Sequence, residues 1–176
     1  MPKIRRLRLL FLTLLGLASA HILVKQWDDY LVINLSDSLP HGLYVRSDQP
    51  IEVGSLVEFA PPLMAVDHAI KRWGETPDRV RFLKPVIAGP GSLISLSSSG
   101  DWLLVNGHPV ASILAHDSDG NPLPCYWKNN PPRVLREHEI LVISFSESSF
   151  DSRYFGVLNT AATDSDFVVR RPFLIW

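Results

Sequence analysis

Proline and glycine interrupt this chain too often for it to form long packed helices. Fourteen Pro and ten Gly occur among 176 residues, and the segments between them are short and rich in Val, Ile, Leu and aromatic residues. Such segments are typical of strands. With 46% hydrophobic residues, the chain can bury one ordinary core but hardly two. The sequence therefore predicts a single, mainly β domain.

The first 26 residues carry an apolar segment behind a basic start. Four Lys and Arg residues precede residues 9–24 (LLFLTLLGLASAHILV), and Arg8 and Lys25 flank the segment. A helix of this length spans about 24 Å, and flanking basic side chains can extend its reach towards the roughly 30 Å of a hydrocarbon core. We expect a transmembrane helix with a cytoplasmic N-terminus, because positive charge stays on that side.

A cleaved signal peptide is the alternative for this segment. Ala18-Ser19-Ala20 has the small-x-small form that a signal peptidase accepts. Both interpretations send the rest of the chain across the membrane. We therefore divide the chain into an N-terminal membrane anchor or signal segment, 1–26, and an exported domain, 27–176.

Charge and cysteine content exclude several functions. Five of the 17 basic residues lie in 1–26, which leaves 12 basic against 18 acidic residues and a net charge of −6 for the remainder. No basic face remains to neutralise phosphates, so nucleic-acid binding is not expected. The single cysteine, Cys125, excludes an internal disulfide and any multi-cysteine zinc site. The six histidines show no metal-ligand spacing, so we expect no metal and no cofactor.

Apolar runs bounded by turn formers predict the strands. Asn106-Gly107 is a strong hairpin signal, because both central positions of a type I′ turn need positive φ. Residues 64–73 have the one credible helical spacing outside the N-terminus, and residues 116–132 form a long connection with room for a short strand at 125–127. The predicted strands lie within residues 31–36, 42–46, 55–60, 79–89, 93–99, 102–107, 139–145 and 167–176.

Two of the three segments that could carry chemistry lie in the first half of the chain. In residues 34–44 (NLSDSLPHGLY), Ser36 and Ser38 follow a predicted strand, where a hydroxyl is well presented but a capped turn is the ordinary explanation. Lys84 sits among apolar residues, where burial lowers the pKa of an amine and allows it to act as a base. A lysine whose stem packs on a strand while its amine reaches water is the ordinary alternative.

The third segment is residues 146–156 (SESSFDSRYFG). Asp151 and Arg153 could pair there and hold a loop in place, although a surface ion pair beside a glycine turn is the ordinary explanation. Taken together, the three segments supply a serine and a base without histidine, since a neutral lysine amine can activate a hydroxyl. His41 is too close to Ser38 along a turn to be assumed to be that base.

This order of motifs resembles the signal peptidase family of serine/lysine proteases (peptidase S26). More narrowly, residues 36–44 and 149–156 resemble the TraF-type conjugative transfer peptidases, which mature pilin precursors. The resemblance extends over residues 34–156 and includes Val53-Gly-Ser-Leu-Val, Pro61-Pro62, Leu83-Lys84 and Pro90-Gly91. It implies a mainly β, signal-peptidase-like domain of short antiparallel strands behind one N-terminal transmembrane helix, with residues 27–176 as the periplasmic peptidase domain.

The resemblance also implies roles for individual residues. Ser38 matches the nucleophile and Lys84 the general base. Ser36 matches the serine whose hydroxyl forms the oxyanion hole together with the Ser38 backbone N–H, and one such donor typically contributes about 3 to 4 kcal/mol to rate.

Two further roles come from the Asp-Ser-Arg segment. Asp151 matches a third catalytic residue of the TraF-type branch, but a carboxylate touching Lys84 would raise the lysine pKa, so we favour an orienting role in a pair with Arg153. Ser149 matches a serine that holds the lysine amine. One departure from the family pattern is Pro85, which stands where a basic residue is usual and suggests that Lys84 lies on an edge strand.

The residues and the resemblance together predict a membrane-anchored serine endopeptidase. Its substrate would be a conjugative pilin precursor or another exported pre-protein, at the periplasmic face of the inner membrane and in the company of other transfer proteins. Hydrolysis and cyclisation of the pilin both remain open. The alternatives are a general leader peptidase and a non-catalytic β scaffold of a transfer complex.

Overall fold

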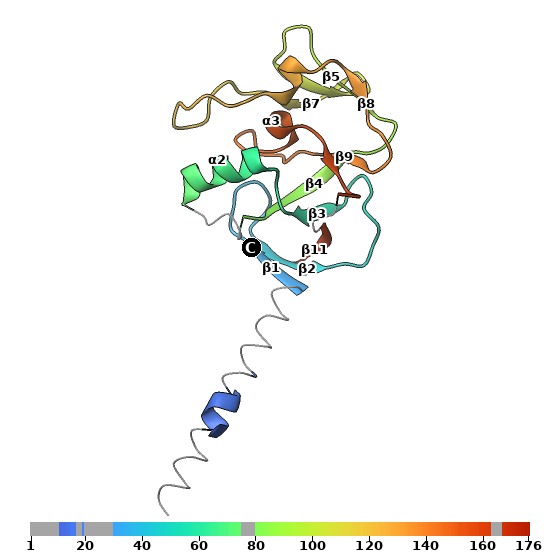
Figure 1. Cartoon of the computed structure of the whole chain (residues 1–176). Coiled ribbons are helices and arrows are strands. Elements are labelled where there is room, and N and C mark those ends of the chain that lie inside the picture. Colours follow the sequence, from blue (N-terminus) through green and yellow to red (C-terminus); the bar gives the residue numbers. More distant parts are fainter. Residues whose placement is uncertain (1–10, 17–18, 20–29, 75–79, 163–166) are drawn as a thin grey trace, which may run out of the picture.

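The computed structural model describes residues 11–16, 19, 30–74, 80–162 and 167–176 (Figure 1). Most of the predicted membrane segment, 9–24, lies outside the described residues. Its residues 11–16 are helical, and their side chains are exposed. Within the described ranges, no helix has the length and apolar character needed to cross a bilayer.

A seven-stranded antiparallel sheet carries most of the domain. Its strands follow the order β1-β2-β11-β3-β4-β9-β10, so the C-terminal strand lies in the middle of the sheet between two strands from the first third of the chain. The bounds are β1 Leu31–Asn34, β2 Gly42–Arg46, β3 Leu56–Phe59, β4 Phe82–Ala88, β9 Glu139–Val142, β10 Leu158–Asn159 and β11 Val168–Ile175. The mainly β prediction is confirmed.

A second, four-stranded antiparallel sheet lies at the opposite end of the domain from β1 and β2 (Figure 1). Asn106 and Gly107 have φ values of 51° and 83°, which confirms the two-residue hairpin predicted between β6 and β7. The order is β7-β6-β5-β8, with bounds β5 Leu93–Leu96, β6 Trp102–Val105, β7 His108–Ser112 and β8 Arg133–Val134.

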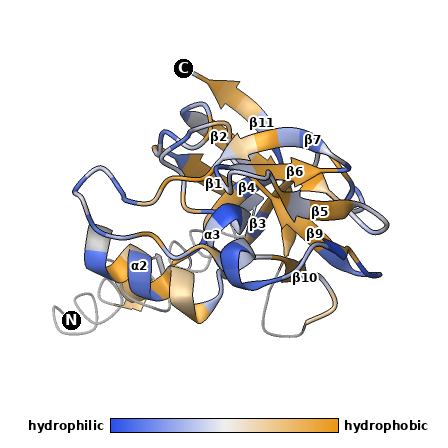
Figure 2. Ribbon diagram, turned by 90° about the horizontal axis from the view of Figure 1, so that it is seen from above, coloured by the Kyte–Doolittle hydropathy of each residue, from blue (hydrophilic) through white to orange (hydrophobic). Residues whose placement is uncertain are grey.

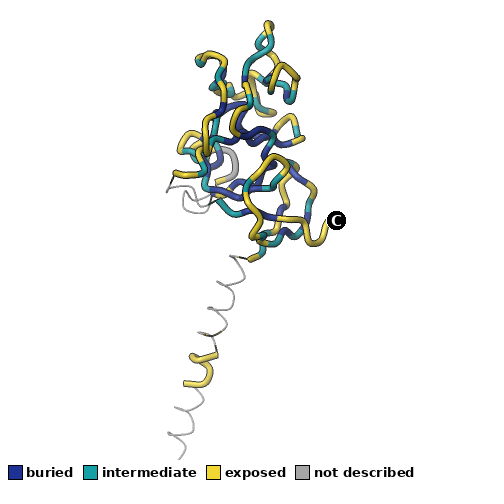
Figure 3. The backbone as a smooth tube through the Cα atoms, turned by 90° about the vertical axis from the view of Figure 1, so that its right-hand side faces the viewer, coloured by how far each residue is buried: buried dark blue, intermediate teal, exposed yellow. Residues whose placement is uncertain are grey.

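Strands β4 and β9 lie between two hydrophobic cores, because successive side chains on a strand point to opposite faces. On β9, Ile140 and Val142 face the main core, whereas Leu141 and the following Ile143 face the core beneath the smaller sheet. In the main core, the ring of Phe59 meets the rings of Phe82 and Phe155 edge-on. Figure 3 shows the buried residues concentrated in the middle of the domain.

Helix α2 (Leu63–Trp73) connects β3 to β4, as the helical spacing of residues 64–73 predicted. Ala65 and Ala69 are fully buried, whereas Asp67 and Lys71 are exposed, and Figure 2 shows hydrophobic and hydrophilic positions mixed along the helix. The helix ends at Gly74, whose left-handed φ of 68° lets its N–H reach the carbonyl of Ile70.

Two expectations from the sequence are wrong. Residues 125–127 form no strand; a 3₁₀ helix, η2 (Tyr126–Asn129), buries Trp127 there, and its indole Nε1 donates to the carbonyl of Ser152 at 2.8 Å. Pro85 does not mark an edge strand, because β4 pairs with β3 on one side and β9 on the other. Its carbonyl accepts from Ile143, one residue beyond the end of β9, so the missing N–H falls where that ladder has already ended.

Candidate active site

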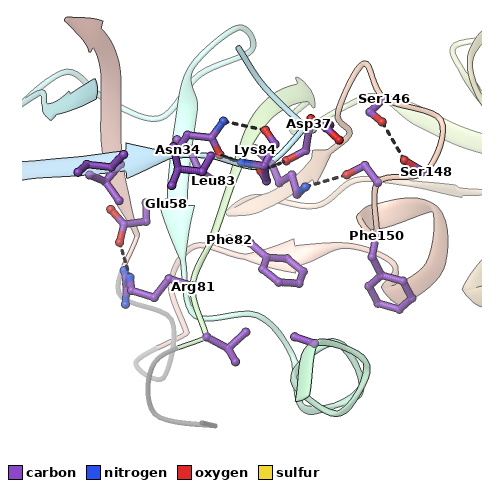
Figure 4. Close-up of a pocket in the computed structure, with 18 residues that line it drawn as sticks. Asn34, Asp37, Glu58, Arg81, Phe82, Leu83, Lys84, Ser146, Ser148 and Phe150 are labelled. Carbon is purple, nitrogen blue, oxygen red and sulfur yellow. Dashed lines mark hydrogen bonds and ion pairs between the residues drawn. The ribbon is translucent and has the colours of Figure 1, made fainter. Parts of the chain in front are cut away.

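A cavity of about 650 Å³ opens between β1, the turn that follows it, β4 and the loop 146–150 (Figure 4). Ser36, Ser38, Lys84 and Ser149 all line it, although they come from three distant parts of the sequence. The fold thus brings four of the sequence-predicted site residues to one place. Their roles stay predictions.

The turn between β1 and β2 presents the two serines. Ser38 is half-buried and Ser36 is exposed, and their Oγ atoms lie 2.8 Å apart. Leu39 anchors the turn by packing against Tyr44 and Leu83. Two hydroxyls from residues separated by one position in the sequence therefore lie side by side in the cavity.

Strand β4 carries Lys84 into the cavity wall. The residue lies between Phe82 and Val86 on the face of β4 that enters the main core, so its side chain is only 6% exposed. Its Nζ donates to Ser149 Oγ at 2.7 Å. Burial lowers the pKa of the Lys84 amine to about 8; the charge of Asp151 raises it, and that of Arg153 lowers it further.

Lys84 and Ser38 line the same cavity but are not directly hydrogen-bonded. Among the described residues, the amine donates to Ser149, whereas the Ser38 hydroxyl pairs with Ser36. The catalytic step proposed below therefore requires the Ser38 proton to turn from one partner to the other.

Asp151 and Arg153 form the ion pair that the sequence suggested, and the pair is buried rather than on the surface. The guanidinium meets both carboxylate oxygens at 2.8 Å, and both side chains are at most 1% exposed. Asp151 also caps the short helix α3 (Ser152–Phe155) by accepting from the Arg153 N–H. The guanidinium also donates to the carbonyls of Ser112, Ser146, Glu147 and Ser149, so this pair fixes the loop that presents Ser149 to the lysine.

Sequence reasoning missed two polar residues of the site. Ser144 is buried; its N–H donates to Asp151 Oδ2 at 3.0 Å, and its Oγ donates to the backbone carbonyl of Ser38. Ser144 and Ser38 lie 106 positions apart, so no local pattern could have paired them. The second is Asn34, which is buried at the end of β1. The available signal was an amide residue that ends an apolar run two positions before Ser36.

The far end of the cavity holds a cluster of charges in which Glu58 and Arg170 are buried and Arg81 is exposed. Glu58 accepts from Arg81 at 2.6 Å and from Arg170 at 2.7 Å, which joins β3, the start of β4 and β11. In the part of the chain that the structure describes, no three His, Cys, Asp or Glu side chains gather where they could hold a metal ion.

Comparison with known proteins places this geometry in a family. A family model described as signal peptidase, peptidase S26, matches residues 4–170. Two plasmid transfer proteins TraF from Escherichia coli are 33% and 32% identical over 153 residues, covering 82% of this chain and of each relative. A conjugal transfer protein TraF from Agrobacterium tumefaciens (strain 15955) is 31% identical over 134 residues, covering 70% of this chain and 72% of its own. The chain therefore belongs to the signal peptidase family, peptidase S26, and is of the TraF type.

Proposed function

We propose that this protein is a membrane-anchored serine endopeptidase in which Ser38 is the nucleophile and Lys84 the general base. The supporting observation is the shared cavity, which holds a half-buried serine hydroxyl and a buried lysine whose pKa is about 8. An amine with that pKa is neutral in a useful fraction of molecules near neutral pH, and only the neutral form can accept a proton. Family membership supports peptidase activity.

The proposed reaction follows acyl transfer. Neutral Lys84 takes the proton of Ser38 Oγ as that oxygen attacks the scissile carbonyl, and the lysine then gives the proton to the leaving amine. The Ser36 hydroxyl and the Ser38 N–H stabilise the oxyanion. An acyl-enzyme remains, and its ester is resolved either by water or by an amine.

We further propose a conjugative pilin precursor as the substrate. The relatives are named plasmid transfer and conjugal transfer proteins, and an exported precursor is the substrate expected of a signal peptidase relative. Resolution of the acyl-enzyme by water would release a linear pilin, whereas resolution by the pilin's own N-terminal amine would release a ring. Other transfer proteins are candidate partners.

An inner-membrane location, with the catalytic domain in the periplasm, is part of the same proposal. Residues 11–16 form an apolar helix with exposed side chains, and 9–24 continues that apolar character in the sequence. Ile33 in β1, Leu35 just after it and residues 173–176 at the end of β11 are also exposed apolar side chains, at the end of the domain that carries β1 and β2 (Figure 1). Such a surface is favoured next to lipid.

Co-expression with the pilin precursor tests this function. Mass spectrometry of the pilin should show processing with the wild-type chain and none with Ser38→Ala or Lys84→Ala. Ser99→Ala and Lys128→Ala, which change exposed residues of the same types outside the cavity, serve as matched controls that should process normally. A product one water lighter than the linear form would establish cyclisation.

Processed pilin in both the Ser38→Ala and Lys84→Ala strains would reject the dyad. Processing of an unrelated exported precursor by the wild-type chain would indicate a general leader peptidase instead.

A further inference from the structure

The carboxamide of Asn34 makes five contacts with the turn that carries the two serines, to Ser36, Leu39 and Pro40. Its Nδ2 donates to the carbonyls of Ser36 and Leu39, each at 3.0 Å, and to that of Pro40 at 3.2 Å. Its Oδ1 accepts from the Ser36 N–H at 3.4 Å and from Ser36 Oγ at 2.8 Å. Asn34 is 8% exposed, so its side chain is buried, whereas its partner Ser36 is exposed.

Chemistry fixes the orientation of this carboxamide. Three carbonyl oxygens can only accept hydrogen bonds, so the amide nitrogen of Asn34 must face them. The amide oxygen then faces the N–H and O–H of Ser36, which are both donors. A flipped carboxamide would set oxygen against three oxygens and nitrogen against two donors.

The same contacts set the direction of the hydroxyl chain. A serine hydroxyl has one proton, and Ser36 gives its proton to Asn34 Oδ1, which can only accept. In the 2.8 Å contact between the two serines, Ser38 must therefore be the donor and Ser36 the acceptor. Protons thus point from Ser38 to Ser36 to Asn34 in the resting site.

We propose that Asn34 is a positioning residue that acts through Ser36. It holds the Ser36 oxygen where the oxyanion will form, and it fixes the turn that carries the Ser38 N–H. When the Ser38 proton passes to Lys84, the Ser36 hydroxyl is free to turn its own proton from Oδ1 to the oxyanion. Asn34 Oδ1 then still accepts from the Ser36 backbone N–H, so its acceptor is not left empty.

This inference rests on the proposed function, because it assigns Asn34 a part in the same reaction. An Asn that only stapled the turn would affect folding or substrate binding, and its loss would combine independently with the loss of the Ser36 hydroxyl. An Asn that acts through Ser36 would change turnover, and the two losses would overlap. A double-mutant cycle separates these cases.

The experiment measures kcat and KM of the full-length enzyme in detergent on purified pilin precursor. We expect Ser36→Ala to lower kcat about 100-fold, as for the loss of one oxyanion donor. We expect Asn34→Ala to lower kcat about 10-fold or more with KM within about twofold of wild type. The Ser36 hydroxyl is still present in this variant, but the hydrogen bond that orients it is lost. The kcat of the double variant should be at most about threefold lower than that of Ser36→Ala alone.

Asn130→Ala is the matched control. Its Nδ2 donates to one backbone carbonyl, that of Tyr126, and it lies outside the cavity, so kcat should stay at the wild-type value. Circular dichroism and thermal unfolding check each variant. If Asn34→Ala does not fold, Asn34→Leu, which has a similar shape and no polar group, takes its place in the same cycle.

The outcomes distinguish this inference from the function beneath it. If Ser38→Ala abolishes processing but the Asn34 and Ser36 effects multiply, or if the Asn34 variant changes KM rather than kcat, the positioning role is rejected and the protease stands. If Ser38→Ala still processes the precursor, the proposed function is rejected, and this inference with it.

Discussion

The Nζ of Lys84 lies 2.7 Å from the Oγ of Ser149, 65 positions further along the chain. The hydrogen bond aims the lysine into the cavity that Ser38 lines, in a wall that excludes most water. Burial stabilises the neutral amine and lowers its pKa to about 8, while the nearby Asp151 opposes part of that effect. At neutral pH the resting amine is therefore mostly charged, with a substantial neutral fraction ready to act.

The rate should follow the deprotonation of this lysine. Because only neutral Lys84 can accept the Ser38 proton, we expect kcat to rise with pH and to level off above an apparent pKa near 8. About a tenth of the molecules would be active at pH 7. Initial rates of precursor cleavage between pH 6 and 9.5 measure this limb, and a rate that does not change with pH over that range would contradict a lysine base.

Removing the partner of the amine should slow the reaction. Ser149→Ala leaves the Nζ of Lys84 without its hydrogen bond in a buried site, so the charged amine loses support and its pKa falls. We expect kcat to drop by about 10-fold or more, because the amine is no longer aimed, with the acid limb at lower pH than in the wild type. The Ser99→Ala variant should match the wild type in both respects. A Ser149→Ala enzyme with the wild-type rate and pH limb would show that this contact is incidental.

The pH profile also separates the two roles of Asp151. The Asp151 carboxylate raises the pKa of Lys84 and the Arg153 guanidinium lowers it, so Asp151→Asn should move the acid limb to lower pH. It also leaves Arg153 buried beside a neutral partner, which should cost about 3 kcal/mol of stability. An orienting role is supported if the folded variant stays active and the acid limb of its pH profile lies at lower pH than in the wild type. Complete loss of activity at every pH, in a variant shown to be folded, would make Asp151 a catalytic residue.

Local sequence patterns predicted most of the fold. Turn formers bounded the strands of the seven-stranded sheet except the two-residue β10, which was not predicted, and Asn106-Gly107 fixed one hairpin by its need for positive φ. The position of β11 could not be foreseen in this way, because its place between β2 and β3 depends on pairing between opposite ends of the chain. Pro85 misled because a proline in an interior strand is tolerated where a neighbouring ladder ends, and that end is a tertiary feature.

The same distinction between local patterns and tertiary contacts applies to the site. Family motifs identified Ser36, Ser38, Lys84 and Ser149, and the fold brings them to one cavity. The contact from Ser144 to the Ser38 carbonyl depends on a register between the β1–β2 turn and the end of β9, which no single segment encodes. Residues proposed to take part in the reaction recur in motifs, because the chemistry needs those residue types. A residue that only donates to a backbone carbonyl leaves no such motif, because many residue types can make that hydrogen bond.

The buried lysine should lower the stability of the fold that carries it. Its pKa in the folded state is about 8 against an ordinary value of 10.5, so between these two pH values the unfolded chain binds more protons and stability rises with pH. Below pH 8 the full cost of burying the ammonium applies, which corresponds to about 3 kcal/mol. Lys84→Met fills the same space without a charge. We expect it to raise the free energy of unfolding at pH 7 by about 1 to 3 kcal/mol, to remove the increase between pH 8 and 10, and to abolish processing. Denaturant unfolding at pH 7 and 9.5 measures both effects, with Lys128→Met as the exposed control. A Lys84→Met protein less stable than wild type at pH 7 would mean that the amine contributes more through its bond to Ser149 than its burial costs.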